Sequence, residues 1–226
     1  MKQKLAIFDF NGTIFPRETM PFLLKQWNKH SYSKSKLFCV FVPLIPLYIK
    51  YKIGVNSNIS KEEMEVKAVK GVSRIFIGMN KKEIENFFSR AVSSASSYFN
   101  KKILEEIYLS NKNNYHTVIL SGAFRLFLLQ VGNLLNIDTV IGSQLLFDNE
   151  CYNSVQMDII SGSNKLEKMQ SFFKEIEIDW ENSKAYADSY HDLRLLKSVG
   201  NPVAVDPDIR LESIANQKKW NIINSD

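Results

Sequence analysis

The residues best suited to chemistry in this sequence are polar side chains that directly follow short apolar runs. Asp9 follows the run 5–8, and Ser121 follows the run 117–120. Such runs are typical of buried strands, and ligands of open α/β sheets bind at the carboxyl ends of the strands. A carboxylate at that edge can act as a nucleophile or bind a metal ion. The alternative for 9–13, Asp-Phe-Asn-Gly-Thr, is an ordinary turn, because turns prefer these residues.

Three further polar residues extend this set. Lys165 begins a helical stretch, and Asp188 and Asp192 follow a third apolar run at 185–187. Each position alone has a plain explanation, since Ser121 fits a turn, Lys165 a surface lysine and Asp188 a helix cap. Together they supply an aspartate nucleophile, carboxylates for Mg²⁺, and a hydroxyl and a lysine for phosphate oxygens. The set therefore indicates a phosphoryl-transfer site.

The elements that must position these residues alternate between strand and helix. Alternation of this kind predicts an α/β fold with a parallel sheet and right-handed crossovers. Strands are predicted at 4–9, 117–120, 140–142, 185–187, 202–205 and 221–223. Helices are predicted around 104–108, at 124–135, from 165 with Leu166, Met169, Phe172, Phe173 and Ile176 on the buried side, through 193–196, and from Pro207 with Asp206 as its cap.

A long helical insertion separates the first strand from this alternation. In the stretch 16–95, a capping box at 60–63 predicts a helix that stops at Gly71, and Asn80 opens a second helix. The second helix has one broad apolar face, formed by Ile84, Phe87, Phe88, Ala91, Val92 and Ala95. Residues 139–160 are predicted to form a core strand and an antiparallel excursion that turns near 148–149.

Composition limits the classes of function. The chain has 226 residues, 45% of them apolar, which is enough to bury a core without staples. Its net charge of +5 is spread without a long basic block, so the usual mark of a nucleic-acid-binding protein is missing. Cys39 and Cys151 match no metal or redox spacing and indicate buried thiols in a reducing compartment.

Location is indicated by two segments. The N-terminus runs straight into the first strand without a signal peptide, which predicts a cytoplasmic protein. The stretch 37–49 is apolar and contains Pro43 and Pro46, but it is shorter than the roughly 20 residues that span a bilayer. We interpret it as a buried part of the insertion, with shallow membrane contact as the alternative.

With these motifs in order, the chain resembles the haloacid dehalogenase superfamily of phosphatases, in its phosphoserine-phosphatase-like branch. The resemblance covers nearly the whole chain and rests on four ordered motifs at 9–13, 121–122, 162–165 and 188–192, with a similar tail at 206–208. It implies a Rossmann-like three-layer core at 1–15 and 96–226 and a helical cap at 16–95. The oligomeric state is left open.

The resemblance also implies a role for each motif residue. Asp9 attacks phosphorus, giving an aspartyl-phosphate that water hydrolyses. Mg²⁺ is held by Asp9, the backbone carbonyl of Asn11, and Asp188. The remaining residues implied to contact or support the phosphoryl group are Gly12, Thr13, Ser121, Gly122 and Lys165, with Asp192 orienting Lys165 or a water.

Two residues depart from the family pattern. Ala187 replaces a frequent Gly, which is a small change, and Asn11 replaces an Asp that protonates the leaving oxygen and then activates water. An amide cannot ionise, so a loss of about 10² to 10⁴ in rate is expected while ligand binding survives. The chain is then a phosphatase altered to trap a ligand, a slow natural enzyme, one with an easy leaving group, or an inactive phospholigand-binding protein.

The insertion is expected to select the substrate. In phosphoserine-specific members a Glu after the first motif binds the substrate amine and a cap Arg binds its carboxylate. Glu18 has the matching spacing, whereas the Arg position falls on or near Glu65, with Lys67 and Arg74 nearby. The substrate is therefore expected to be a small phosphomonoester, with an amine or hydroxyls but no carboxylate. A lipid-linked phosphate remains the alternative if the segment 37–49 meets a membrane.

Overall fold

The sheet at the centre of the fold has seven strands. The computed structural model describes residues 2–30, 32–38, 40, 61–153 and 155–225. Within them the strand order is β4-β3-β2-β1-β5-β6-β7, and every pairing is parallel except that of β4 with β3. The strands are β1 (Leu5–Phe8), β2 (His116–Phe124), β3 (Thr139–Leu145), β4 (Met157–Asp158), β5 (Lys184–Ala187), β6 (Asn201–Val205) and β7 (Asn221–Ile223).

The central strand β1 marks a reversal in strand order. From β1 the chain builds outward through β2, β3 and β4 on one side, and then returns to place β5, β6 and β7 on the other. A parallel sheet forms a ligand crevice outside the carboxyl ends of its strands where the order reverses. The end of β1 at Phe8 is therefore the place in this fold where a site is expected.

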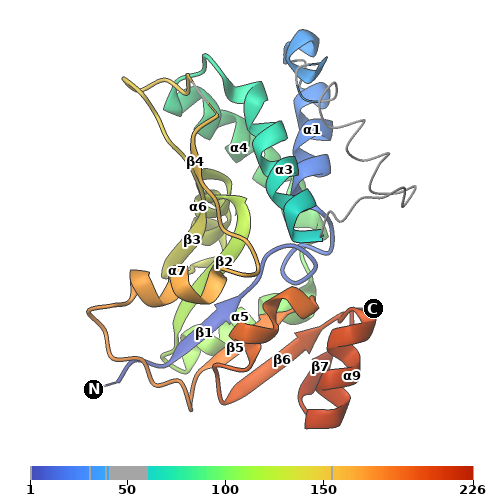
Figure 1. Ribbon diagram of the computed structural model, residues 1–226, viewed down its shortest axis with the longest axis vertical. Coiled ribbons are helices and arrows are strands. Elements are labelled where there is room, and N and C mark those ends of the chain that lie inside the picture. The colour runs from blue at the N-terminus through green and yellow to red at the C-terminus, as the bar shows by residue number, and fades with distance from the viewer. Residues whose placement is uncertain (1, 31, 39, 41–60, 154, 226) are drawn as a thin grey trace.

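Helices cover both faces of the sheet, which gives three layers (Figure 1). Alternate residues of β1 face opposite layers: Ala6 and Phe8 belong to one apolar cluster, Leu5 and Ile7 to the other, and all are fully buried. A strand buried on both faces reads as a continuous apolar run. On the first face lie α5 (Lys101–Lys112) and α6 (Arg125–Leu135), and on the second α7 (Lys165–Phe172), α8 (Leu193–Leu196) and α9 (Ile209–Lys218).

The helical insertion is confirmed and lies above the sheet in Figure 1. It contains α1 (Thr19–Lys29), α3 (Lys61–Ser73), the 3₁₀ turn η1 (Arg74–Phe76), α4 (Lys81–Ala95), and is followed by η2 (Ser96–Tyr98). The predicted capping box of α4 is present, with Asn80 accepting from Glu83 and Glu83 from Asn80, and the predicted apolar face is buried.

The insertion shares its core with the sheet. Phe88 of α4 packs against Phe124 at the end of β2 and Phe127 of α6, with ring centroids 5.8 Å apart in both pairs. The predicted excursion after β3 adds a second connection. There, the backbone N–H of Gly78 donates to Tyr152 (2.8 Å) and that of Tyr152 to Met79 (2.9 Å). This end of the insertion is therefore fixed to the rest of the fold.

Four expectations about the ends of helices and strands were wrong. The helix predicted to stop at Gly71 continues to Ser73, because burial of Val69 and Val72 outweighs the roughly 1 kcal/mol cost of a helical Gly. The second strand does not stop at Ser121 but runs on irregularly to Phe124, which pairs with β3. Ser121 and Gly122 therefore belong to β2 itself and do not follow it.

The third and fourth errors concern the helices on the second face. Phe172 is 56% and Ile176 48% exposed, because α7 ends after eight residues and Phe173 takes the core position. Asp206 does not cap α9. Its backbone has a positive φ of 39°, and the cap is Asp208, whose carboxylate accepts from two backbone N–H groups of the first turn.

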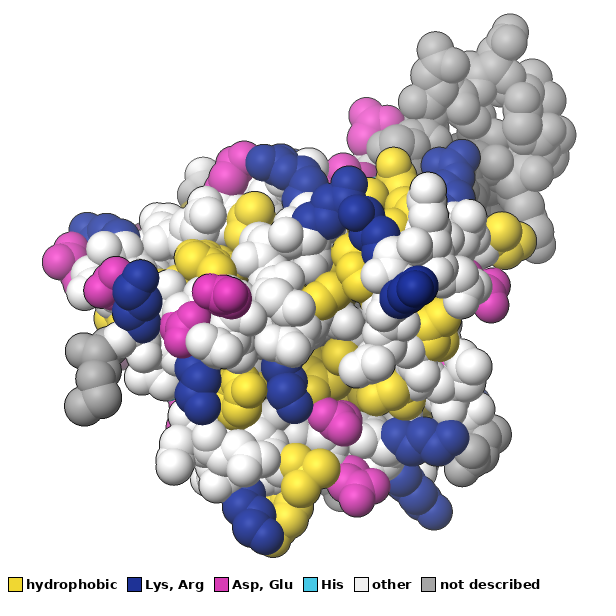
Figure 2. Space-filling model, turned by 90° about the horizontal axis from the view of Figure 1, so that it is seen from below, with side chains coloured by type: hydrophobic (Ala, Val, Ile, Leu, Met, Phe, Trp, Pro, Cys, Tyr) yellow, Lys and Arg dark blue, Asp and Glu magenta, His cyan; other side chains and the backbone are white. Residues whose placement is uncertain are grey.

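Some expectations lie outside the described residues. They concern Cys39, Ser60 as a helix cap, and most of the apolar stretch 37–49. Among the described residues, no helix is long and apolar enough to cross a membrane. Figure 2 shows Lys and Arg side chains interspersed with Asp and Glu on the face it presents, without a basic block.

Candidate active site

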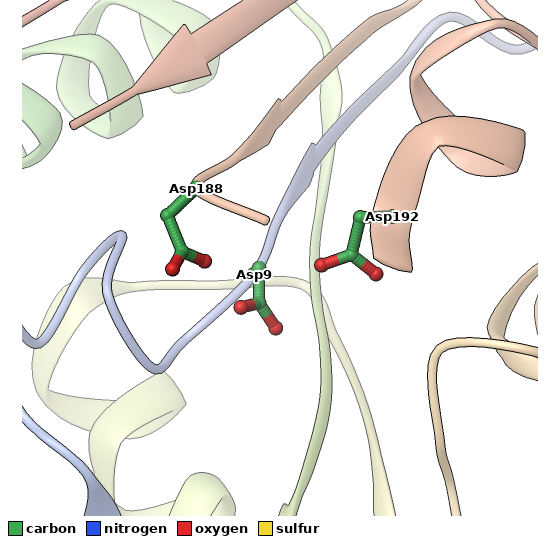
Figure 3. Close-up of side chains that lie close together, drawn as sticks. All are labelled: Asp9, Asp188 and Asp192. Carbon is green, nitrogen blue, oxygen red and sulfur yellow. The ribbon is translucent and has the colours of Figure 1, made fainter. Parts of the chain in front are cut away.

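Three aspartates meet at the carboxyl ends of two neighbouring strands (Figure 3). Asp9 follows β1, Asp188 follows β5, and Asp192 ends the 3₁₀ turn η3 (Tyr190–Asp192). One carboxylate oxygen from each lies within 4.8 Å of the others. The backbone N–H of Asp9 donates to the carbonyl of Tyr186 (2.9 Å), so the pairing of β1 with β5 holds the cluster together.

A buried lysine joins two of these carboxylates. The Nζ of Lys165, at the first residue of α7, lies 2.8 Å from Oδ1 of Asp9 and 2.9 Å from Oδ2 of Asp192. Burial alone would lower the pKa of Lys165, but Asp192 and Asp9 together raise it above its ordinary value. Lys165 therefore stays charged and holds both carboxylates in place.

The third carboxylate lacks such a partner. No ion pair to Asp188 occurs among the described residues, and burial, with Asp9 and Asp192 nearby, raises its pKa to about 8. Burial also raises the pKa of Asp9 to about 6, although Lys165 opposes the shift. Three carboxylates facing one ammonium leave uncompensated negative charge when all are ionised. Oxygen ligands of this kind fit a hard divalent cation.

The turn after Asp9 is shaped by glycine. Gly12 has a φ of +73°, and a Cβ built on it would lie 2.3 Å from Oδ2 of Asp188. Its N–H donates to the carbonyl of Phe15 (2.8 Å), which closes the turn. Thr13 is fully buried, and its hydroxyl has no partner among the described residues. Because Gly12 has no Cβ, the carboxylate of Asp188 can lie against the turn.

Asn11 is fixed by the first turn of α1. Its Oδ1 accepts from the backbone N–H of Thr19 (3.2 Å) and from the Thr19 hydroxyl. The backbone N–H can only donate, so it requires an oxygen at this place and orients the amide. Asn11 thus caps α1 as well as standing beside Asp9, and an Asp could accept the same two bonds.

A cavity of about 330 Å³ opens over the cluster. It brings together most predicted site residues, and Glu18 and Glu65 of the insertion are exposed at it. Lys67 and Arg74, the other candidates for the cap position, do not line it. The predicted site residues among its lining are Asp9, Asn11, Glu18, Ser121, Gly122, Lys165, Asp188 and Asp192.

The tail at 206–208 supports the loop that carries Asp188. The N–H of Asp208 donates to the carbonyl of Asp188 (2.9 Å), and its carboxylate accepts from the N–H of Tyr190 (2.8 Å). Because the other oxygen of Asp208 caps α9, one side chain joins that helix to the loop.

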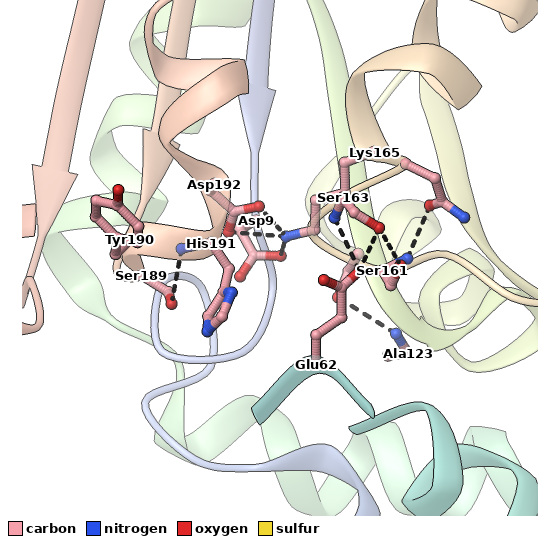
Figure 4. A network of polar contacts seen from close by, with 12 residues as sticks. Asp9, Glu62, Ala123, Ser161, Ser163, Lys165, Ser189, Tyr190, His191 and Asp192 are labelled. Carbon is pink, nitrogen blue, oxygen red and sulfur yellow. Dashed lines mark hydrogen bonds and ion pairs between the residues drawn. The ribbon is translucent and has the colours of Figure 1, made fainter. Parts of the chain in front are cut away.

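Several residues at the site were not predicted. Met20, Met64 and Val69 line the cavity from the insertion, and His191 lines it from η3. Glu62 was expected only as part of a helix start, yet its side chain reaches the loop before Lys165 (Figure 4). The helical period of the insertion could have indicated Met64 and Val69, whereas nothing local indicates the contact of Glu62.

Comparison with known proteins gives matches in sequence. Residues 6–197 match the model of the haloacid dehalogenase-like hydrolases. The phosphoserine phosphatase SerB1 of Mycobacterium tuberculosis is 35% identical over 65 residues, which is 29% of this chain and 21% of that protein. A histidinol-phosphatase of Neisseria meningitidis is 51% identical over 39 residues, 17% of this chain and 18% of that protein. The matches thus span about a fifth of these relatives.

Solved structures match over nearly the whole chain. A protein of unknown function from Bordetella pertussis Tohama I has a TM-score of 0.80 at 13% identity, covering 99% of both chains. A phosphoserine phosphatase, solved as a phospho-aspartyl intermediate analogue, has a TM-score of 0.57 at 17% identity, covering 100% of this chain and 95% of that one. At these identities the likeness establishes the fold. The family is established by the sequence model, which matches well over half of the residues: the chain belongs to the haloacid dehalogenase-like hydrolases.

Proposed function

We propose that this protein is a magnesium-dependent phosphomonoesterase that works through an aspartyl-phosphate on Asp9. One observation carries the proposal: Lys165 bonds Asp9 and Asp192, while Asp188 lies in the same cluster and forms no ion pair with a Lys or Arg of the described residues. A nucleophile, a phosphate-binding ammonium and a place for a divalent cation then lie together at the end of β1. Phosphoryl transfer needs these groups and little else from a protein.

The cation is proposed to be Mg²⁺, held by the carboxylates of Asp9 and Asp188 and the backbone carbonyl of Asn11. The clustered carboxylate oxygens fit such an ion, because Mg²⁺ prefers oxygen ligands. When bound, the ion supplies charge neutralisation for phosphate oxygens and for the carboxylates themselves.

The chain's own residues carry the reaction. A carboxylate oxygen of Asp9 forms a bond to phosphorus as the bond to the leaving alcohol breaks, and water later releases phosphate from Asp9. Ser121 is buried at the cavity, and its hydroxyl donates a hydrogen bond to a phosphoryl oxygen. The ammonium of Lys165 offsets the negative charge that develops on the phosphoryl oxygens. Asn11 cannot give a proton to the leaving oxygen or take one from water, so both steps are expected to be slow.

The helical insertion at 16–95 is proposed to act as a cap over the core at 1–15 and 96–226. Its contribution to the cavity is acidic and apolar, through Glu18, Glu65 and the side chains of Met20 and Met64. Of the described residues that line the cavity, Lys165 is the only Lys or Arg, and it is already paired. These walls favour a leaving group with an amine and no carboxylate.

The relatives agree with this class only in part. Two of the sequence relatives are named as a phosphoserine phosphatase and a histidinol-phosphatase. Both substrates carry an amine, but only phosphoserine carries a carboxylate. The acidic cavity walls favour a substrate without a carboxylate, such as histidinol phosphate, over phosphoserine.

A matched pair of substrates tests this function. Phosphoethanolamine equals phosphoserine without its carboxylate, so the two compare that one group. With Mg²⁺ and the Asn11→Asp form, we expect kcat/KM to be about tenfold or more higher for phosphoethanolamine, because a carboxylate beside Glu18 and Glu65 is repelled. Amino-diol phosphates and glycerol phosphates complete the panel and separate the need for an amine from the need for hydroxyls. A clear preference for phosphoserine contradicts the assigned substrate class.

The proposed metal site predicts a pH dependence. Asp188 and Asp9 have raised pKa values, about 8 and about 6, so the folded metal-free protein keeps protons that the unfolded chain has released above about pH 4. The free energy of unfolding should therefore fall as pH rises from about 4 to about 8 when a chelator is present. Mg²⁺ competes with these protons, so its stabilising effect should grow over the same range.

Calorimetry at about pH 5 and about pH 8, with chelator or with Mg²⁺, measures both effects. Asp188→Asn is the control, because it removes the carboxyl with the larger pKa shift and a proposed Mg²⁺ ligand, so both the pH dependence and the effect of Mg²⁺ should shrink. A Mg²⁺-induced rise in Tm that is equal at both pH values contradicts the site.

A further inference from the structure

The first turn of α3 is bonded to the loop that precedes Lys165 (Figure 4). Oε1 of Glu62 accepts from the backbone N–H of Ser163 (3.0 Å) and from the Ser163 hydroxyl, across 101 residues of sequence. Burial works to raise the pKa of Glu62, but hydrogen bonds from Ser161 and Ser163 outweigh it and lower the pKa. The carboxylate is therefore ionised at neutral pH, and the contact is charge-assisted.

The loop 161–165 is compact, so a shift of Ser163 must reach Lys165. The N–H of Lys165 donates to the carbonyl of Ser161 (3.0 Å), and the N–H of Ser161 donates to the side chain of Asn164 (2.9 Å). The carbonyl of Ser163 also accepts from Arg194 of α8 (3.1 Å). Ser163 is thus held between the insertion and the helix that follows Asp192.

The same contact joins the two walls of the cavity. One wall comes from α3, through Met64 and Val69, and the facing wall comes from Ser161 and Gly162 of the loop. Gly162 has no room to move toward η3, since a Cβ built on it would lie 2.8 Å from Cβ of His191. The loop is therefore packed against η3 on one side, and Glu62 of α3 supplies a further contact to it.

The far end of the insertion is secured by other means. Gly78 and Met79 bond to Tyr152, and the rings of α4 pack on those of β2 and α6. The start of α3 lies beyond the reach of these contacts, where Glu62 bonds to the loop. Val69 and Val72 hold the later turns of α3 in the core, and the bond of Glu62 links the first turn of the helix to the loop that carries Lys165.

We propose that Glu62 is a positioning residue: by bonding Ser163 it closes the α3 wall of the cavity and fixes the loop that places Lys165 against Asp9. The inference rests on the proposed phosphatase function. Glu62 is not among the residues that line the cavity, so it acts through Ser163. Such a link lets the insertion, which selects the leaving group, set the position of the phosphate-binding lysine.

Two substitutions at Glu62 test whether its hydrogen bonds to Ser163 position the loop or whether any change at this residue disturbs the structure. Both bonds end on one oxygen, so Glu62→Gln can keep them, whereas Glu62→Ala removes them. In the Asn11→Asp form, we expect Glu62→Ala to lower kcat/KM about tenfold, mainly through KM, and Glu62→Gln to stay within about threefold. Lys67→Ala, on the exposed face of the same helix, is the control and should leave both kcat and KM unchanged.

A second variant tests the pair from the other side. Ser163→Ala keeps the backbone bond and loses the hydroxyl, so its effect should be smaller than that of Glu62→Ala. The double variant should be no worse than Glu62→Ala alone, because both changes remove parts of one contact. Fully additive losses contradict the pairing.

Amide hydrogen exchange provides a readout that does not need activity. Glu62→Ala should speed exchange across 161–165, while Glu62→Gln and Lys67→Ala leave it unchanged, measured in the full chain with Mg²⁺ and inorganic phosphate. Unchanged exchange in Glu62→Ala overturns the inference, as does an equal loss of kcat/KM in the Ala and Gln variants. If no form turns over any phosphomonoester, the proposed function fails while the exchange result still decides the role of Glu62.

Discussion

Asn11→Asp should raise kcat for a magnesium-dependent phosphomonoesterase reaction by about 10² to 10⁴, the usual contribution of a general acid and base. The expected gain follows from the position of residue 11. It lies beside Asp9 at the cavity, and its oxygen accepts two bonds from Thr19. An Asp can keep one oxygen in these bonds and use the other to exchange protons with the leaving alcohol and with water.

The measurement is a steady-state assay of both forms on the same phosphomonoester, with Mg²⁺ and with chelator. KM should change little, since Asp has nearly the same shape as the Asn that lines the cavity. Asn11→Ala is the matched control, because it removes the Thr19 contacts without adding a proton donor, and it should not raise kcat. Activity that is absent from every form contradicts catalysis and supports a phospholigand-binding protein. Equal activity in the Asn and Asp forms indicates a leaving group that needs no acid.

Asp9→Asn should lower kcat by about 10⁴ or more in the Asn11→Asp background, because loss of the nucleophile removes the covalent route. The fold should tolerate the change. Burial raises the pKa of Asp9 to about 6, so keeping this carboxylate ionised at neutral pH lowers the free energy of unfolding, and Asn fills the same space without the charge. Lys165 keeps its contact with Asp192.

Tm and turnover together test this prediction. We expect a Tm at neutral pH that is no lower than that of the parent, with turnover at the background rate. Ser121→Ala provides a comparison, since it removes one phosphate donor and should cost far less, about 10² to 10³, in line with the loss of a single oxyanion donor. Substantial turnover by folded Asp9→Asn contradicts the role of Asp9.

The parts of the fold that could be predicted from sequence are those specified by local chemistry. The apolar run 5–8 is a strand buried on both faces, and Asn80 with Glu83 forms the capping box expected of that spacing. The motif residues at strand ends meet because parallel strands present their carboxyl ends at one edge. Short-range patterns were sufficient for these features.

The errors arise where distant contacts decide between local options. Asp206 and Asp208 both fit a helix cap, and the choice falls on Asp208 because Asp206 accepts instead from the N–H of Ser225 (2.7 Å). Phe172 fits the apolar period of α7 but lies past its packed turns. Glu62 and Ser163 are 101 residues apart, so no periodicity links them.

One role of Asn11 could be predicted from the sequence, and a second could not. The resemblance to the family predicts an Asp at this position, and the proposed loss of proton transfer follows from the amide of Asn11 alone. Its second role, as the acceptor that caps α1 through Thr19, depends on the turn at Gly12 bringing the chain back over Asp188. That turn exists only in the folded protein.

The central claim, that Asp9 is the nucleophile, can be tested most directly on the chain with Asn11 in place. Without a general base the aspartyl-phosphate should be hydrolysed slowly and accumulate when a phosphoryl donor with a good leaving group, such as acetyl phosphate, is supplied with Mg²⁺. Mass spectrometry of the rapidly acidified protein should show the added mass of one phosphoryl group, mapping to the peptide that contains Asp9. The label should be absent from Asp9→Asn and short-lived in Asn11→Asp. A phosphoryl group on another residue, or its persistence in Asp9→Asn, contradicts the claim.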